Sequence, residues 1–260
     1  MIKNNFDISK KHILVCGGSG QLGTSLIKFL LDKNAKIINF DKYKINIIHP
    51  NYKFYKINIT SEKDVVKKIK SLKKEYKKID ILINLFHFKG STKLEPFNSF
   101  FNDFHNYPLK IWKETLNVNL NGLFIICKNV IKIMLENKKG IILNTSSTYG
   151  INSPVKSIYG KSGINSPIGY ATSKAAIINF TKYIATHYAD KNIRANTLSP
   201  GGINNKKQSK SFKKQYSIRT PMGRMADVDE FNESVLYLIS DASRYVTGTN
   251  LVVDGGWSAW

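Results

Sequence analysis

The stretch that decides the fold is ILVCGGSGQLGTSLIKFLL, residues 13–31. It opens with an apolar run typical of a buried strand, passes through a glycine-rich turn and continues with helical apolar periodicity. Glycines let such a turn adopt unusual backbone angles and let a pyrophosphate approach the N–H groups at the helix start. The strand, turn and helix together predict a dinucleotide-binding unit. Its phosphate contacts would come from Gly17, Gly18, Ser19, Gly20, Gln21, Leu22 and Gly23.

Strand-like and helix-like segments alternate along the rest of the chain. Predicted strands cover 12–17, 36–41, 53–58, 80–85, 140–146, 193–199 and 250–255, and predicted helices lie near 21–33, 62–78, 111–137, 169–190 and 227–240. This alternation predicts an α/β fold, a Rossmann-like doubly wound parallel sheet of about seven strands with helices on both faces. We expect one domain over 1–260, with 86–110, 148–169 and 203–219 as loops or a mobile lid around the site.

The charge of the chain raises the question of a nucleic-acid partner. There are 40 Lys and Arg residues against 18 Asp and Glu, a formal net charge of +22. However, almost all of the basic residues are lysines, and the densest run, 61–80, has an apolar stripe at Val66, Ile69, Leu72 and Tyr76. Its lysines then form a solvated helix face, so we expect no nucleic acid.

The two cysteines, Cys16 and Cys127, indicate no disulfide framework. We find no signal-like segment and no apolar run of about 18 residues. The expectation is a cytoplasmic protein without a membrane partner. The histidines show no metal-ligand spacing, so no metal is expected, and Ser147 lacks the G-x-S-x-G pattern of a hydrolase.

Asp41 ends the strand after the glycine turn. A carboxylate there can accept hydrogen bonds from ribose hydroxyls and repel a 2′-phosphate, which favours NAD over NADP. The plain alternative is a turn residue, and the neighbouring Lys42 and Lys44 could weaken the preference.

A second informative stretch is YGKSGINSPIGYATSK, residues 159–174. A tyrosine transfers protons near neutral pH only if positive charge lowers its pKa from about 10. A lysine four residues later lies one turn along the same helix face. Tyr170 and Lys174 have this spacing, whereas the residue four after Tyr159 is Gly163. Tyr170 is therefore the predicted proton-transfer group beside a nicotinamide.

These motifs resemble the short-chain dehydrogenase/reductase family from about Lys11 to the C-terminus. The resemblance covers the glycine turn, NVNLNG (117–122), NTSS (144–147), YATSK (170–174), IRANTLSPGGI (193–203) and VTGTNLVVDGG (246–256), in the family's order. It implies an NAD(P)-dependent alcohol/carbonyl oxidoreductase that acts on a small molecule and forms a homo-oligomer, a dimer or a tetramer.

The resemblance also assigns roles to residues. Asn119 would hold a water relay, Ser147 would orient the substrate oxygen, Tyr170 would be the acid/base, and Lys174 would bind the nicotinamide ribose and lower the pKa of Tyr170. Further cofactor contacts implied by the resemblance are Asn58, Ile59, Asn84, Pro200, Gly201 and Ile203.

Several features depart from the family pattern. The spacing of Gly17, Gly20 and Gly23 is commoner in its epimerase and dehydratase branch, NLFH (84–87) replaces the usual NNAG, and Asn58 stands where an aspartate is frequent. The segment between Ser147 and Tyr170 is also unusually long. Together with the long 86–110 loop, SPGGINN, TPMGRMA (220–226) and the GGWSAW ending, it resembles a subgroup of oxidoreductases linked to bacterial surface carbohydrates, including nonulosonic acids, which favours a sugar-derived substrate. Candidate substrate contacts are Tyr149, Tyr159 and His87.

Two alternatives stay open on the sequence. One is a sugar-nucleotide epimerase or dehydratase, favoured by the glycine spacing. The other is a non-catalytic nucleotide-binding regulator or a lysine-rich nucleic-acid binder, against which the Asn, Ser, Tyr and Lys set argues.

Overall fold

The computed structural model describes residues 4–90 and 93–260; residues 91–92 of the expected 86–110 loop lie outside them. Its seven strands form one parallel sheet in the order β3-β2-β1-β4-β5-β6-β7. This confirms the predicted fold class. The strands are β1 (His12–Cys16), β2 (Lys36–Asp41), β3 (Tyr52–Lys56), β4 (Ile81–Asn84), β5 (Gly140–Thr145), β6 (Ile193–Pro200) and β7 (Asn250–Val253).

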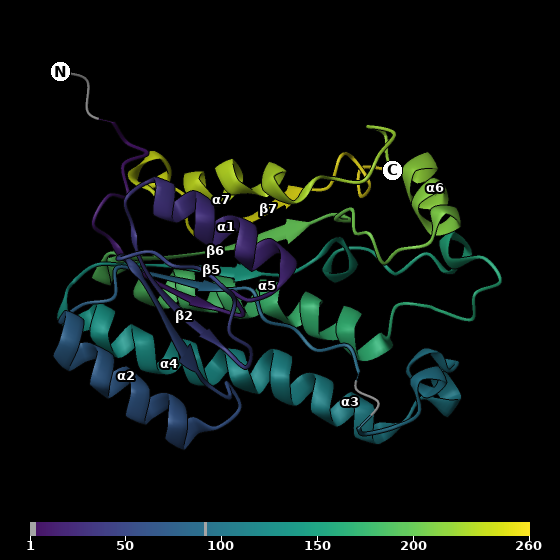
Figure 1. Cartoon of the computed structure of the whole chain (residues 1–260), viewed down its shortest axis with the longest axis horizontal. Helices are drawn as coiled ribbons and strands as arrows, with labels where there is room; N and C mark the ends of the chain where they lie inside the picture. The colour runs from purple at the N-terminus through teal and green to yellow at the C-terminus, as the bar shows by residue number, and fades with distance from the viewer. Residues whose placement is uncertain (1–3, 91–92) are drawn as a thin grey trace.

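Helices cover both faces of the sheet, as Figure 1 shows. One face carries α1 (Gln21–Asp32) and α7 (Asn232–Ile239), and the other carries α2 (Glu62–Tyr76), α4 (Gly122–Glu136) and α5 (Ile168–Tyr188). The central strands β1, β4 and β5 are buried along their whole length, because each has helices on both sides. Two large apolar clusters result, one on each face of the sheet.

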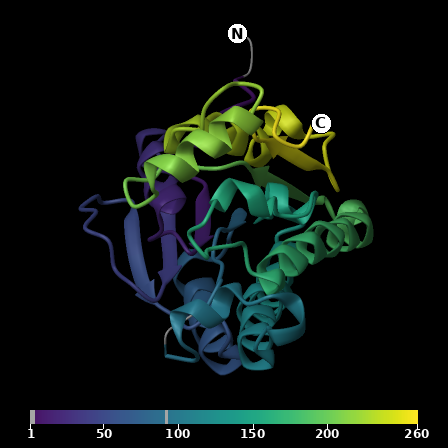
Figure 2. The ribbon, with the colours of Figure 1, turned by 90° about the vertical axis from the view of Figure 1, so that its right-hand side faces the viewer.

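The chain reverses its winding between β1 and β4. Strands β2 and β3 extend the sheet to one side of β1, and β4 to β7 extend it to the other. The crevice at the carboxyl ends of two such strands is where open α/β sheets bind ligands. In Figure 1 the β6 arrow points to the right, so the carboxyl ends of the parallel strands lie on that side, and Figure 2 views the molecule from there. The helix α6 (Lys210–Arg219) lies on that side.

The helix predicted over 111–137 is built in three parts. It comprises α3 (Leu109–Leu116), a π-helical turn (Asn117–Asn121) and α4. By length and composition, Leu109–Glu136 could cross a membrane, so the expectation that no such segment exists is wrong. Its apolar window is 61% buried inside the fold, and α4 packs its apolar residues into the core beside α2 and the sheet.

The segment expected to be a loop over 203–219 contains the helix α6, which is a correction. Ser209 caps this helix, because its Oγ accepts a hydrogen bond from the Phe212 N–H at 3.2 Å. Tyr216 is the helix's one buried residue, so α6 has no apolar periodicity for a sequence pattern to reveal. The other expected loops hold short 3₁₀ turns at Phe97–Phe101, Phe104–Asn106, Thr148–Gly150 and Lys156–Tyr159. In α2 the buried stripe is Val65, Ile69 and Leu72, with Val66 half-buried.

Candidate active site

The glycine turn between β1 and α1 is too tight for side chains at Gly17, Gly18 and Gly23. Gly17 has φ +82°, and a Cβ there would overlap the backbone of Phe86 in the segment after β4. At Gly23, a Cβ would lie 2.6 Å from the Cα of Gly18. Glycine at these positions brings the start of α1 against the end of β1. The free N–H groups of α1 therefore face the crevice, where they can bind an anion.

A cavity of about 670 Å³ lies on the β2 side of this turn. We call it the Asp41 cavity. The Asp41 carboxylate accepts hydrogen bonds from the N–H groups of Ser19 at 2.9 Å and Tyr43 at 3.1 Å. Asp41 therefore joins the end of β2 to the glycine turn at the cavity wall. Other lining residues include Gly17, Gly20, Lys42, Ile57, Ile59, Phe86 and His87.

A second cavity of about 450 Å³ continues from the same turn toward β5 and β6. We call it the Tyr170 cavity. It shares Gly17, Gly20, Leu85 and His87 with the Asp41 cavity, so the two adjoin across the strand ends. It brings together most of the predicted residues. These are Gln21, Leu22, Gly23, Ser147, Tyr149, Tyr159, Tyr170, Lys174, Pro200, Gly201 and Ile203.

Tyr170 has an unusual electrostatic environment. The Lys89 Nζ lies 4.2 Å and the Lys174 Nζ 5.7 Å from the centroid of its ring. Burial of Tyr170 opposes ionisation, but the charges of Lys89 and Lys174 and a hydrogen bond with Ser147 outweigh it, so the Tyr170 pKa is lowered. Lys174 is only 2% exposed, and its Nζ donates to the Thr145 carbonyl at 2.7 Å. Tyr170 can therefore exchange a proton nearer to neutral pH than an ordinary tyrosine.

Tyr159 lines the same cavity in a different environment. Its hydroxyl lies 3.3 Å from the hydroxyl of Tyr149. Burial raises the pKa of both phenols. Among the residues that the structure describes, the lysines placed over a tyrosine ring lie over Tyr55, Tyr76 and Tyr170. Of the three tyrosines, only Tyr170 has surroundings that favour proton transfer.

Asn119 lies in the π-helical turn and ties two parts of the site together. Its amide Nδ2 donates to the Ser173 Oγ at 2.9 Å and to the Phe88 carbonyl at 3.1 Å. Its Oδ1 accepts from the Phe88 N–H at 2.7 Å. The side chain thus joins α5, next to Lys174, to the segment after β4. Turns of this kind often occur at functional sites.

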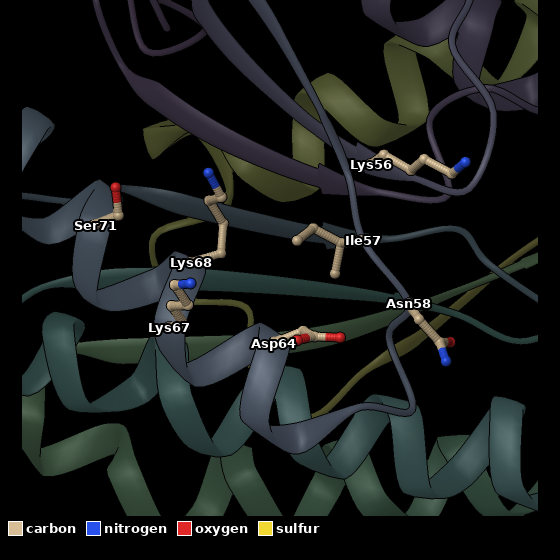
Figure 3. Close-up of a pocket in the computed structure, with 7 residues that line it drawn as sticks. All are labelled: Lys56, Ile57, Asn58, Asp64, Lys67, Lys68 and Ser71. Atoms are coloured by element: carbon tan, nitrogen blue, oxygen red, sulfur yellow. The ribbon is translucent and has the colours of Figure 1, made fainter.

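Two predicted cofactor contacts lie elsewhere. The Asn58 Oδ1 accepts hydrogen bonds from the N–H and Oγ1 of Thr60, and the residue lines a separate surface pocket beside α2 (Figure 3). Asn84 is buried inside the sheet, where its Nδ2 donates to the Asn144 Oδ1 at 2.8 Å. Neither residue lines the Asp41 or Tyr170 cavity, whereas Ile59 does line the Asp41 cavity.

Sequence reasoning missed Lys89 and the wall formed by α6. Phe212 and Tyr216 of α6 line the Tyr170 cavity, together with Gln208 and Met225 on either side of the helix. Tyr216 closes over the end of β6, because its Oη accepts a hydrogen bond from the Gly202 N–H at 2.7 Å. Lys89 could have been noticed as a lysine shortly after a predicted strand end, but nothing in the sequence says which site it faces.

The adjoining cavities fit a nicotinamide dinucleotide. The glycine turn offers backbone N–H groups for a pyrophosphate at the point where the two cavities meet. The Asp41 carboxylate can accept hydrogen bonds on one side, and a proton-transfer group lies on the other. This donor set suits a molecule with a ribose at one end and a redox ring at the other.

Comparisons with known proteins agree with this geometry. A family model described as enoyl-(acyl carrier protein) reductase matches residues 44–258. A solved short-chain dehydrogenase of Leptospira borgpetersenii with bound NAD⁺ is 36% identical, with a TM-score of 0.90, over 99% of this chain and 97% of that one. The 3-oxoacyl-[acyl-carrier-protein] reductase FabG of Thermotoga maritima is 28% identical, over 95% of this chain and 97% of the relative. The 2-dehydro-3-deoxy-D-gluconate 5-dehydrogenase of Pseudoalteromonas atlantica is also 28% identical, over 97% of each chain. This chain belongs to the short-chain dehydrogenase/reductase family of NAD(P)-dependent oxidoreductases.

Proposed function

We propose that this enzyme interconverts an alcohol and a carbonyl on a hydroxylated, sugar-derived small molecule, with NAD(H) preferred over NADP(H). The observation that carries the proposal is the placement of Tyr170 close to both Lys89 and Lys174, in a cavity that adjoins the glycine turn.

In this proposal Tyr170 moves the proton. A bound nicotinamide supplies or accepts the hydride. During alcohol oxidation the Tyr170 Oη takes the proton of the substrate hydroxyl, and during carbonyl reduction it returns one. Ser147, which hydrogen-bonds to Tyr170, holds the same substrate oxygen. Lys174 favours the ionised tyrosine, and the Thr145 carbonyl fixes its Nζ in place.

The cofactor would be held by residues of both cavities. The N–H groups of the glycine turn would bind the pyrophosphate. Ile57 and Ile59 would line the adenosine end, and the backbone over 200–203 together with Lys174 would hold the nicotinamide end. Asn119 acts as a positioning residue, since it links α5 to the segment that carries Lys89.

The preference for NAD is supported by Asp41. Its carboxylate faces the Asp41 cavity, where a 2′-phosphate would meet an acidic group. The similar Leptospira enzyme was solved with NAD⁺. Lys42 lines the same cavity and acts in the opposite direction, so the preference is a balance between two neighbouring charges.

A sugar-derived substrate is supported by the hydroxyls of the cavity wall and by the name of the Pseudoalteromonas relative, whose substrate is a sugar acid. The finer likeness to a nonulosonic acid subgroup gains no support from the relatives named above, so only the broader substrate class is proposed. The epimerase or dehydratase alternative rests on glycine spacing alone, and the surroundings of Tyr170 do not favour a non-catalytic regulator.

The test is a screen of NAD- and NADP-linked turnover at 340 nm over sugars, polyols, sugar acids, sugar phosphates and nucleotide sugars. We expect NAD-linked turnover with at least one member and a kcat that is lower by about 10²–10⁴-fold in the Tyr170→Phe variant. An undiminished kcat in Tyr170→Phe, or no turnover of the wild type in either direction across the panel, would refute the proposal.

A further inference from the structure

We propose that Lys89 binds an anionic group of the substrate, so that the natural substrate is a negatively charged hydroxy or keto compound. The inference rests on the proposed oxidoreductase function and adds the substrate's charge to it. It concerns a lysine outside the Tyr-x-x-x-Lys motif, contributed by the segment that follows β4.

The backbone on both sides of Lys89 is held in place. Before it, the N–H and the carbonyl of Phe88 both hydrogen-bond to the Asn119 amide, at 2.7 and 3.1 Å. After it, Gly90 has φ +149° and packs against Phe100 so closely that a Cβ would lie 2.7 Å from the ring. A lysine anchored in this way presents its side chain to the cavity from a fixed base, although the residue itself is exposed.

Two of the described lysines line this cavity, Lys89 and Lys174, and only the ammonium group of Lys89 is available to bind a ligand. Its Nζ lies over the Tyr170 ring at 4.2 Å, and no carboxylate among the described residues forms an ion pair with it. The Lys174 Nζ, by contrast, is buried and already donates to the Thr145 carbonyl. None of the described residues that line the cavity is Asp or Glu. The cavity thus has positive charge without a protein counter-ion.

His87 is the other titratable side chain on this segment that lines the cavity, and its ring lies 5.8 Å from that of Tyr170. Although the residue is exposed, desolvation of its ring at the cavity wall and the charges of Lys174 and Lys89 lower its pKa, so it is neutral near pH 7. His87 can then form hydrogen bonds with a substrate, but the attraction for an anion comes from Lys89.

The position of Lys89 relative to the reaction gives the inference its chemistry. A substrate oxygen bound to Tyr170 and Ser147 brings the rest of the molecule past the ammonium group over the Tyr170 ring. A carboxylate or a phosphate there would form a charge-assisted hydrogen bond with the Nζ. A neutral polyol would gain no such bond, so charge becomes a means of substrate selection.

The experiment measures binding by isothermal titration calorimetry to the full chain saturated with NADH. The probes are tartrate for a carboxylate, glycerol 3-phosphate for a phosphate and erythritol as the neutral compound. The variants are Lys89→Met, Lys89→Arg and Lys161→Met. Lys161 is an exposed lysine that lines neither cavity and is the matched control. NADH affinity, measured for every variant, checks that the fold is intact.

We expect wild type to bind at least one anionic probe more tightly than erythritol. Lys89→Met should weaken that probe by roughly tenfold to a hundredfold, the range of a charge-assisted hydrogen bond, and leave erythritol unchanged. Lys89→Arg should retain most of the affinity and Lys161→Met all of it. The probe that responds shows whether the group is a carboxylate or a phosphate. Equal binding of all three probes to wild type, an unchanged anion affinity in Lys89→Met, or an equal loss for erythritol would each overturn the inference.

Turnover separates this inference from the proposed function. If only neutral substrates react, and no anionic probe loses affinity in Lys89→Met, Lys89 is not an anion-binding residue, yet the oxidoreductase stands. If the anion binds in a Lys89-dependent way but no alcohol or carbonyl reacts, the proposed function fails and the binding site stands.

Discussion

The choice between two tyrosines can be tested by removing one hydroxyl at a time. In Tyr170→Phe the ring remains, so its packing beside His87 is retained. The lost oxygen is the one whose pKa Lys89 and Lys174 lower. In Tyr159→Phe the lost oxygen is the one that faces the Tyr149 hydroxyl at 3.3 Å. Both substitutions remove a single atom from the same cavity, so each is the control for the other.

The expected losses of activity differ in size, because the Tyr170 hydroxyl transfers a proton whereas the Tyr159 hydroxyl forms a neutral hydrogen bond. Removing a positioned acid or base costs typically 10²–10⁴-fold in rate, and we expect Tyr170→Phe to lose kcat by that factor. The long contact between Tyr159 and Tyr149 is a neutral hydrogen bond worth about 0.5–1.5 kcal/mol. Even if all of it were lost in the transition state, kcat/KM would fall by about tenfold at most.

The assay is NAD-linked oxidation of the best substrate from the screen, with NADH binding followed by fluorescence. Tyr170→Phe should keep NADH affinity within about twofold, since the phenol is the proton-transfer group and most cofactor contacts lie elsewhere. A large kcat loss in Tyr159→Phe together with an active Tyr170→Phe would refute the assignment.

Three further predictions come from the geometry of the site and the glycine turn, and a fourth comes from the family resemblance. Asp41→Ala should weaken NAD binding more than NADP binding in fluorescence titrations, and equal losses would contradict the ribose role. Because the ionised Tyr170 accepts the proton, the rate of alcohol oxidation should rise with pH. Lys89→Met removes a charge that lowers the Tyr170 pKa, so this rise should move to higher pH for a neutral alcohol. An unchanged pH profile would contradict the assigned effect of Lys89 on the Tyr170 pKa. Gly23→Ala should lower the free energy of unfolding in urea by about 1–3 kcal/mol, because the added Cβ overlaps the turn. Gly20→Ala, whose Cβ would lie 3.8 Å from its nearest neighbour, should lower it by less than about 1 kcal/mol. Similar urea midpoints for the two variants would show that the turn relaxes around the extra methyl group. The family resemblance also predicts a homo-oligomer, and a monomeric mass by light scattering would reject it.

The sequence predicted the parts of the site that depend on neighbouring residues. A strand, a glycine turn and a helix are local, and so is the one-turn spacing of Tyr170 and Lys174. Asp41 could be found because strand β2 ends there. Lys89 could not be assigned, because its approach to Tyr170 depends on β4 lying between β1 and β5. No pattern within its own segment encodes that order.

Other differences between the expectations and the structure have equally physical causes. Helix α6 buries only Tyr216, so a segment that folds as a helix has the sequence of a polar loop. Asn58 occupies the expected place in the chain, but its side chain turns back to hydrogen-bond Thr60. Asn84 is used inside the sheet, where it bonds to Asn144 on the next strand. In each case the residue type was compatible with the expected role, and tertiary packing gave it another.

The wall of the Tyr170 cavity has its own small apolar cluster, separate from the two clusters that hold the sheet. Ile158 from the long segment after β5, Tyr216 from α6, Met225 and Trp257 pack together, with Tyr159 and Phe212 against them. Tyr216 stacks on Trp257 at 4.1 Å. Segments that share one cluster tend to open together, at a free-energy cost below that of global unfolding. Substrate entry would then expose all of these segments at once in hydrogen exchange. Changes in this wall could alter which molecules enter, while Tyr170 and Lys174 keep their geometry because their helix α5 is packed into the main core through Ile177 and Ile184.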